Sequence, residues 1–319
     1  MSRTETAPAA AVTPRGSGPA PTRKSGRRGE EIAKVLFVVP AAVAMVLLFG
    51  YPVVKNVIMS LQDYGLKTFF TGDAPFVGVA NYGQILTDQL FSKAMVNTAL
   101  FTLGSIVGQF VIGMALALFF HKNFPLGGVI RALFLLPWLL PLIVASASWR
   151  SILEQDSGII NVTLQNIGII DGPIPWLTSP DVALISIILV NIWIGIPFNM
   201  TLLYSGLQAI PEELYEAGAL DGATHWKAFQ HITWPTLRPV VSVVLILGIV
   251  YTLKVIDIIL GLTGGGPSNA TQTIATQAYE RSFVEFKFGE GAALSNVLII
   301  ISLIFAVIYL RANRRAADE

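Results

Sequence analysis

Long apolar stretches alternate with short polar ones along most of this chain. Six stretches carry leucine, isoleucine, valine and alanine in mixed order over at least the roughly 20 residues that a helix needs to cross a bilayer. They cover residues 35–59, 95–120, 129–152, 183–205, 239–262 and 291–311. None shows the strict alternation of a membrane barrel strand, and a helix satisfies its own backbone hydrogen bonds in lipid. The pattern predicts an all-α polytopic membrane protein with six transmembrane helices.

The composition agrees with a chain embedded in the lipid bilayer. Hydrophobic residues make up 53% of it, charged residues 13%, and the mean hydropathy is +0.64. Soluble domains carry about a quarter charged residues. The chain has no cysteine, which excludes disulfides and thiol chemistry. The net charge of +1 gives no sign of nucleic-acid binding, and we expect no nucleic-acid partner.

The distribution of basic residues predicts the orientation of the spans. Fourteen of the 21 Lys and Arg residues fall in segments on the same side as the N-terminus. Cytoplasmic segments carry an excess of Lys and Arg. We therefore expect a multi-pass protein of the plasma membrane with both termini, and residues 207–238, in the cytoplasm.

The two ends of the chain differ from the apolar region at 35–311. Residues 1–34 are rich in Ala, Pro, Thr, Ser, Gly and Arg, a composition that cannot bury enough apolar surface to fold alone. We expect a disordered cytoplasmic tail there and a second cytoplasmic tail at 312–319. The alternative is a cleaved signal peptide. The apolar run from Val35 is longer than a usual signal core, and no small-x-small site follows it promptly.

The polar segment 207–238, between the fourth and fifth apolar stretches, is too long for a simple turn. Pro211 suits the first turn of a helix, and Glu212 and Glu213 complement the positive end of its dipole. Gly222 permits positive φ, so the chain can turn there. The pattern favours a helix–turn–helix surface that a partner holds, with a solvated amphipathic loop as the alternative.

The spacing within this segment resembles the EAA loop in the permease subunits of ABC importers. The matching positions are Glu216, Ala217, Gly222, Ile232 and Pro235. Gly218 stands where a second Ala is usual, and Trp234 where Leu is usual. The resemblance implies an ATPase-coupling role for Glu216, Ala217, Gly218, Asp221, Gly222 and Ala223. Asp221 is expected to cap a second helix that starts at about Ala223.

Further short motifs extend the resemblance over about residues 35–311. They are Pro75–Tyr82, Gly158–Asn161, Trp176-Leu177, Asn191–Phe198, and Asp257 with Leu262–Pro267. Their order resembles the MalF/UgpA-like branch of carbohydrate importer permeases, which have the MetI-like fold. The resemblance implies an external binding protein, a second homologous permease and an ABC ATPase dimer as partners.

Catalytic chemistry is missing from the sequence. No Gly-x-x-x-x-Gly-Lys-Ser/Thr phosphate loop is present, and no Lys follows the glycine-rich Gly264–Pro267. We therefore expect ATP and Mg²⁺ on partner ATPase subunits and no cofactor on this chain. The three histidines, at 121, 225 and 231, lack His-Glu-x-x-His spacing. We expect no metal site, no catalytic residue and no enzyme activity.

Polar and aromatic residues inside spans are the default candidates for a substrate path. The fourth and fifth stretches carry Asn191, Trp193, Asn199, Tyr204, Tyr251, Lys254 and Asp257. The spacing of Lys254 and Asp257 would let them neutralise each other on one helix face.

The resemblance adds five positions that correspond to sugar contacts in the family's maltose permease. These are Gly195, Phe198, Tyr251, Thr252 and Val255. The family has Tyr at the position of Phe198, and Asn at those of Thr252 and Val255. The aromatic element is kept and two amides are lost, which implies a carbohydrate other than maltose. Packing is the alternative role for each of these side chains.

The sequence therefore predicts a permease subunit of an ATP-driven carbohydrate importer. An importer of glycerol-3-phosphate or its diesters is the alternative within the class, with Lys254 as the basic group inside a span. An ion-coupled secondary transporter is the alternative from another class. It would need intramembrane acids and internal repeats. Asp257 is the obvious acid, and no repeat is visible.

Overall fold

The computed structural model describes residues 25–122 and 124–318. Regular structure in this part of the chain is helical, apart from one isolated β-bridge between Gln62 and Phe76. Five of the described helices are long and apolar enough to cross a membrane, and a bent pair adds a sixth if counted as one span. The all-α prediction is confirmed. The chain divides into two compact units, Met1–Val54 and Lys55–Glu319.

The first unit contains α1 (Ser25–Met45), a π-helical turn (Val46–Gly50) and the start of α2 (Tyr51–Ser60). The predicted disordered tail at 1–34 lies outside the described residues as far as residue 24. Its last part, 25–34, is helical instead. Extending an existing helix adds one hydrogen bond for each residue fixed, so the apolar helix recruits the residues before it.

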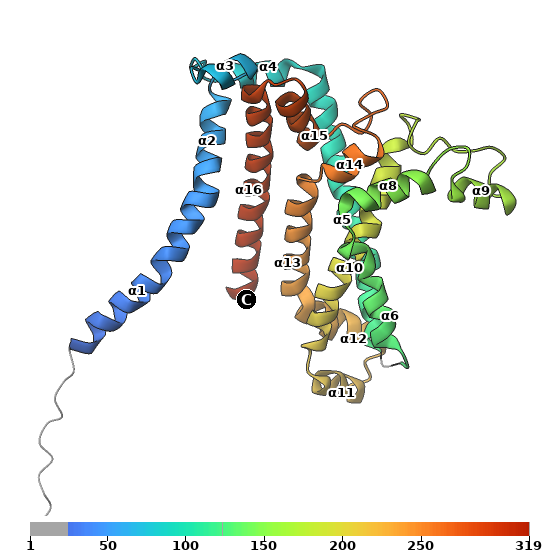
Figure 1. Cartoon of the computed structure of the whole chain (residues 1–319). Helices are drawn as coiled ribbons and strands as arrows, with labels where there is room; N and C mark the ends of the chain where they lie inside the picture. Colours follow the sequence, from blue (N-terminus) through green and yellow to red (C-terminus); the bar gives the residue numbers. More distant parts are fainter. Residues whose placement is uncertain (1–24, 123, 319) are drawn as a thin grey trace, which may run out of the picture. The chain divides into compact units, whose positions relative to one another are not determined.

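Four long helices organise the second unit: α5 (Gln89–His121), α10 (Ala183–Gln208), α13 (Trp234–Leu253) and α16 (Phe288–Asp318). Helices α5 and α10 pack along each other, and α13 packs against both (Figure 1). The predicted C-terminal tail is helical up to residue 318, because Ala and Arg are strong helix formers.

The predicted span at 129–152 is not one continuous helix in the structure. The structure has α6 (Gly127–Phe134), α7 (Leu136–Leu139) and α8 (Leu142–Ile152), with a bend of 96° between Leu139 and Leu142. Pro141 explains the break, because proline lacks a backbone N–H and disfavours helical φ/ψ at the residue before it. Leu140 is accordingly extended, with φ −72° and ψ 137°.

The fifth span also differs from the predicted 239–262. The chain forms α12 (His225–Ala228), a π-helical turn (Phe229–Thr233) and α13, which together give one apolar span from His225 to Leu253. Residues 254–256 are not helical, and α14 (Asp257–Leu262) starts a new helix. The β-branched Val255 and Ile256 weaken helix propagation, while Asp257 favours a helix start.

Short helices cover the end of the second unit opposite α11 (Glu212–Leu220), as Figure 1 shows. They are α3 (Leu66–Thr71), α4 (Ala80–Thr87) and α15 (Ile274–Tyr279), while α9 (Ile159–Asn166) follows α8. Arg281 ties this end together through ion pairs with Asp88 at 2.6 Å and Glu285 at 2.8 Å. Burial would raise the pKa of the Glu285 carboxyl, but the hydrogen bond from Lys287 and the charge of Arg281 outweigh it and lower that pKa.

Two of the sequence motifs, Pro75–Tyr82 and Gly158–Asn161, make hydrogen bonds that hold loops in place. Asn81 donates hydrogen bonds to the backbone oxygens of Ser60 and Gln62, both at 2.9 Å. The Tyr82 hydroxyl accepts a hydrogen bond from Asn296 at 2.9 Å. In the second motif, Asn161 accepts the Trp176 indole N–H at 2.9 Å. These side chains hold loops to helices, so the motifs carry structure.

Candidate functional site

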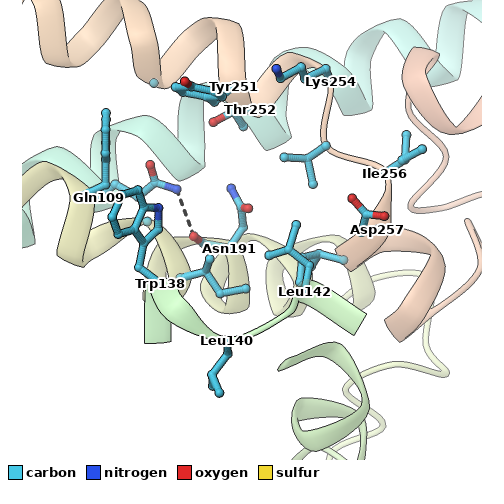
Figure 2. A pocket seen from close by; sticks show the side chains of 16 residues that line it. Gln109, Trp138, Leu140, Leu142, Asn191, Tyr251, Thr252, Lys254, Ile256 and Asp257 are labelled. Atoms are coloured by element: carbon cyan, nitrogen blue, oxygen red, sulfur yellow. Dashed lines mark hydrogen bonds between the residues drawn. The ribbon is translucent and has the colours of Figure 1, made fainter. Parts of the chain in front are cut away.

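A cavity of about 640 Å³ lies in the second unit, among α5, α7, α8, α10, α13 and α14 (Figure 2). Its lining includes all five positions assigned to the substrate pathway from sequence: Gly195, Phe198, Tyr251, Thr252 and Val255. The breaks at 140–141 and 254–256 both border it. Interrupted helices at membrane depth are tolerated where their backbone lines a cavity. The structure therefore brings the five positions together, and their contact with substrate stays a prediction.

Three aromatic rings form one wall of the cavity. The ring of Phe198 lies 6.0 Å from that of Trp138 and 6.1 Å from that of Tyr251, measured between centroids. The second pair is edge-to-face, with an interplanar angle of 81°. Trp138, on α7, was missed from the sequence because a straight helix over 129–152 gives no reason for it to face α10. The wall offers flat apolar faces to a ligand.

Polar groups from α5 and α10 lie beside this wall. Gln109 donates from Nε2 to the backbone oxygen of Asn191 at 2.9 Å. Asn199 donates to the Gly195 oxygen at 3.0 Å and to Gln109 Oε1 at 3.5 Å. A Cβ on Gly195 would overlap the Gln109 amide, so this glycine makes room for the glutamine. Gln109 was missed from the sequence, although a lone Gln in an apolar stretch is a signal.

The two charged residues of the cavity do not pair with each other, so the predicted neutralisation of Lys254 by Asp257 is wrong. Helix α13 ends at Leu253, and the spacing of three residues therefore does not place them on one helix face. The Lys254 ammonium lies 4.8 Å from the ring centre of Tyr251 instead, a cation–π contact. Both residues line the cavity and carry opposite formal charges without forming an ion pair.

The second candidate site is the segment that resembles the EAA loop. Pro211 precedes α11, and Glu212 and Glu213 occupy its first turn. The helix closes at Gly222, where φ is +76°. The Ala223 N–H donates to the Gly218 oxygen at 2.8 Å and the Gly222 N–H to the Ala219 oxygen at 3.1 Å. These bonds form a Schellman motif, so the predicted turn at Gly222 is confirmed.

The predicted capping role of Asp221 is wrong. Asp221 occupies the C-cap of α11, and α12 starts at His225 after Thr224 rather than at Ala223. The physical reason is that the Schellman motif uses the Ala223 N–H to close α11, so the chain must leave the turn before another helix begins.

Packing inside this segment links positions of the sequence motif. A Cβ on Gly218 would lie 2.7 Å from Cδ1 of Ile232. The glycine that stands in place of the usual alanine therefore lets Ile232 pack closely against α11. The Tyr215 hydroxyl lies 2.9 Å from that of Thr233, which joins α11 to the π-helical turn.

The outer face of α11 is exposed. Glu216 and Ala217 both lie on it. Leu220, one turn after Glu216, is 90% exposed. The sequence reading overlooked Leu220, although a large apolar residue in a polar segment is a sign of a contact surface.

Residues 109–317 match the family model described as binding-protein-dependent transport system inner membrane component. The trehalose/maltose transport system permease protein MalF of Thermococcus litoralis is 34% identical over 283 residues, covering 89% of this chain and 94% of that protein. The diacetylchitobiose uptake system permease protein DasB of Streptomyces coelicolor is 30% identical over 309 residues, covering 95% and 93%.

The fold is also that of a solved transporter component. A chain in the crystal structure of a bacterial alginate ABC transporter, in complex with its alginate pentasaccharide-bound periplasmic protein, superposes with a TM-score of 0.77. The identity is 19%, and the match covers 92% of this chain and 98% of the other. This likeness shows the fold.

Proposed function

This chain belongs to the family of inner membrane components of binding-protein-dependent transport systems, and from that premise we propose that it is a permease subunit of an ATP-driven importer of a carbohydrate. The cavity carries the proposal. Three aromatic rings lie beside the carboxamide of Asn191 and the hydroxyl of Thr252. Sugars stack C–H faces on rings while their hydroxyls pair with polar groups, which suits such a lining.

The names of the relatives support a carbohydrate cargo. The two relatives above are named for trehalose or maltose and for diacetylchitobiose, and a third, from Agrobacterium fabrum, is named for sulfoquinovosyl glycerol. The chain covers more than nine tenths of each of them. These cargoes share the sugar ring and differ in its substituents, so the class is proposed here without a particular member.

Movement in this proposal is driven from outside the chain. Partner ATPase subunits bind ATP and Mg²⁺, since the sequence has no phosphate loop. They dock on α11, where Leu220 supplies an apolar anchor and Glu216 a charge that meets a basic partner. The Schellman turn at Gly222 keeps α11 at a fixed angle to α12. The coupling positions Glu216, Ala217, Gly218, Asp221, Gly222 and Ala223 act through this shape.

The assembly needs further partners and one orientation. A second homologous permease and an extracytoplasmic binding protein complete the importer, and α11 and both termini face the cytoplasm. The absence of native cysteine permits a direct test. A Thr224→Cys variant should stay unlabelled in intact cells by an impermeant thiol reagent added outside. If Thr224→Cys is labelled as strongly in intact cells as after permeabilisation, α11 faces the outside and the proposed orientation is wrong.

A phosphate-bearing cargo is the less favoured alternative. Lys254 lines the cavity and would attract an anion, but Asp257 lines the same cavity and would repel it. The net formal charge of this pair favours a neutral cargo.

Reconstituted vesicles test the proposal. The chain is co-purified with its partner permease, ATPase and binding protein, and uptake of trehalose, maltose, diacetylchitobiose and glycerol-3-phosphate is followed with and without ATP. ATP-dependent uptake of a sugar is the expected result. Uptake of glycerol-3-phosphate and of none of the sugars would show that the cargo is a phosphate ester and not a carbohydrate. Sugar uptake that needs an ion gradient and no ATP would show that the chain is not part of an ATP-driven importer.

A further inference from the structure

A second cavity, of about 1340 Å³, opens at the end of the second unit where α11 lies. It is bordered by the last turns of α5 and α10, by α11 and α12, and by the π-helical turn that follows α12. Figure 1 shows α6, α11 and α12 at this same end. No described residue lines both this cavity and the one around Phe198. It is therefore a separate space, which we call the inner pocket.

Basic side chains gather around the inner pocket. Lys122 lines it together with the imidazoles of His121 and His225. Arg131, on α6, lies with its guanidinium carbon 4.1 Å from the ring centre of Tyr204, and this ring lines the pocket as well. These groups come from the end of α5, from α6 and from α12, so the fold brings together positive charge that is scattered in the sequence.

The two full cations, Lys122 and Arg131, have no carboxylate within 4 Å among the described residues. At the opposite end of the unit the pattern is reversed, because Arg281 pairs with three carboxylates. Glu212 is the carboxylate among the described residues that line the pocket. Two cations against one carboxylate leave a positive charge unmatched, and such a concave surface attracts an anion.

Hydrogen-bond donors at the inner pocket suit an anion with several oxygens. The Tyr204 hydroxyl accepts from Gln208 Nε2 at 2.7 Å, which leaves its own hydrogen for an acceptor in the pocket. The cation–π contact holds the Arg131 guanidinium beside the same tyrosine. A guanidinium binds phosphate in a bidentate way, and a lysine binds it as a point charge. Donors that converge from separate helices therefore match a phosphate group.

The inner pocket also has the features of a membrane edge. Val129 and Leu133, one turn apart on the helix that carries Arg131, are 58% and 57% exposed. Trp226, in the lining, is 66% exposed, and tryptophan is enriched where membrane meets water. Basic pockets between helices on the cytoplasmic side bind the head groups of anionic lipids. A phosphate at Arg131 would place acyl chains along the apolar face of α6.

We propose that the inner pocket binds a phosphate group through Arg131, Lys122 and Tyr204. A lipid head group of the cytoplasmic leaflet and a free phosphate in the cytoplasm share this chemistry. The inner pocket is separate from the cavity proposed for the cargo, so this inference goes beyond the proposed function and uses from it only the orientation. A phosphate held here would join the ends of α5 and α10 to α6, beside the segment proposed to receive the ATPase.

The first experiment measures lipid binding to the assembled transporter in detergent by native mass spectrometry. The probes are phosphatidylglycerol and diacylglycerol with the same acyl chains. Arg131→Gln and Lys122→Gln should each weaken binding of phosphatidylglycerol about fivefold, as one charge contact predicts, and leave that of diacylglycerol unchanged. Arg131→Lys keeps the charge and should retain most of the affinity. Arg150→Gln removes an exposed charge of α8 outside the pocket and should match the wild type.

The second experiment tests a free ligand. The same proteins, without added lipid, are dialysed to equilibrium against radiolabelled inorganic phosphate. If a free phosphate suffices, the wild type should bind it, and Arg131→Gln and Lys122→Gln should each weaken that binding about fivefold. Melting temperatures are compared in parallel. The Lys122 side chain is exposed, so Lys122→Gln should melt as the wild type does and gives an answer even where Arg131→Gln unfolds.

The outcomes identify the source of the phosphate or overturn the proposal. Weakened binding of phosphatidylglycerol alone assigns the pocket to a lipid head group, and weakened binding of inorganic phosphate alone assigns it to a soluble ligand. If Arg131→Gln and Lys122→Gln bind both probes as the wild type does, the proposal is overturned. An equal loss in Arg150→Gln also overturns it, because net charge would then explain the effect. Neither experiment involves a cargo, so a failure here leaves the proposed import of a carbohydrate intact.

Discussion

The α11–Gly222–α12 segment and the cavity among α5, α10 and α13 are built in opposite ways. The segment is exposed, and its shape comes from contacts within residues 211–233, above all the turn at Gly222. The cavity lies between helices far apart in sequence, such as α5 with Gln109 and α13 with Tyr251. One region depends on backbone shape and the other on side chains that converge.

This difference assigns different tasks to the two regions. A rigid exposed helix is suited to carry a displacement from one protein to another, since its shape does not depend on the cargo. Converging rings and amides are suited to recognition, since each contributes contact with a ligand. Changes in the α11 segment should therefore alter the maximal transport rate, and changes in the cavity should alter the concentration of cargo required.

The largest effect should come from Gly222→Val. Its φ of +76° is a genuine outlier for a β-branched residue, and no atom lies within 4 Å of an added Cβ, so strain rather than a clash is the cause. The maximal rate of ATP-dependent uptake should fall at least about tenfold, the equivalent of about 1.4 kcal/mol. Gly222→Asn, which tolerates this conformation, is the control and should keep most of the rate. Equal rates in the two variants would show that the turn does not transmit force.

A smaller effect should follow from removing a ring of the aromatic wall. Phe198→Ala and Tyr251→Ala each delete a face beside the cavity, and loss of about 1 kcal/mol should raise KM about fivefold. The maximal rate should change little. Phe119→Ala, on an exposed ring of α5 outside the cavity, is the control. If the control variant raises KM as much as the two cavity variants, the wall has no part in recognition.

Glu216→Lys should have a weaker effect on assembly. The side chain is exposed, and exposed charge pairs contribute up to about 1 kcal/mol, so co-purification of the ATPase should drop about two- to fivefold. The deficit should shrink at high salt, which screens such pairs. Glu213→Lys makes the same change in net charge one turn earlier and should retain more ATPase. An equal loss in both would point to net charge rather than to a specific contact.

Gly218→Ala should have the smallest effect. The added Cβ meets the flexible end of the Ile232 side chain, which can move by rotating about its own bonds. Uptake should stay within about twofold of the wild type, because alanine also favours the helix. Gly218→Val is the sharper variant and should reduce the maximal rate more. A severe loss of uptake in Gly218→Ala would mean that α11 and Ile232 cannot accommodate even one added methyl group.

Local rules made the α11 segment predictable. Pro211, the acidic first turn and a glycine in left-handed conformation at Gly222 each act within a few residues, and the structure has all three. Asp221 was misassigned because a capping residue can serve the helix before it or after it. Backbone hydrogen bonds decide which of the two helices Asp221 ends or begins. Because every residue type can make them, the sequence does not show which helix it is.

The cavity was predictable only in part. Resemblance placed Phe198 and Tyr251, which share one wall, and the polar residues of the fourth stretch included Asn191, but neither pointed to Trp138 or Gln109. Hydropathy averages over a whole stretch, so it hides the break at Pro141 that turns the chain by 96°. Distances between helices arise from packing, which no local pattern in this chain encodes.

The division of labour is tested most directly by sugar-stimulated ATP hydrolysis in reconstituted vesicles, measured over a range of sugar concentrations for Gly222→Val and Tyr251→Ala. The account predicts that Gly222→Val lowers the maximal rate at an unchanged half-saturating concentration. Tyr251→Ala should raise that concentration at an unchanged maximal rate. A shift of the same parameter in both variants would contradict the account, because the two regions would then not act separately.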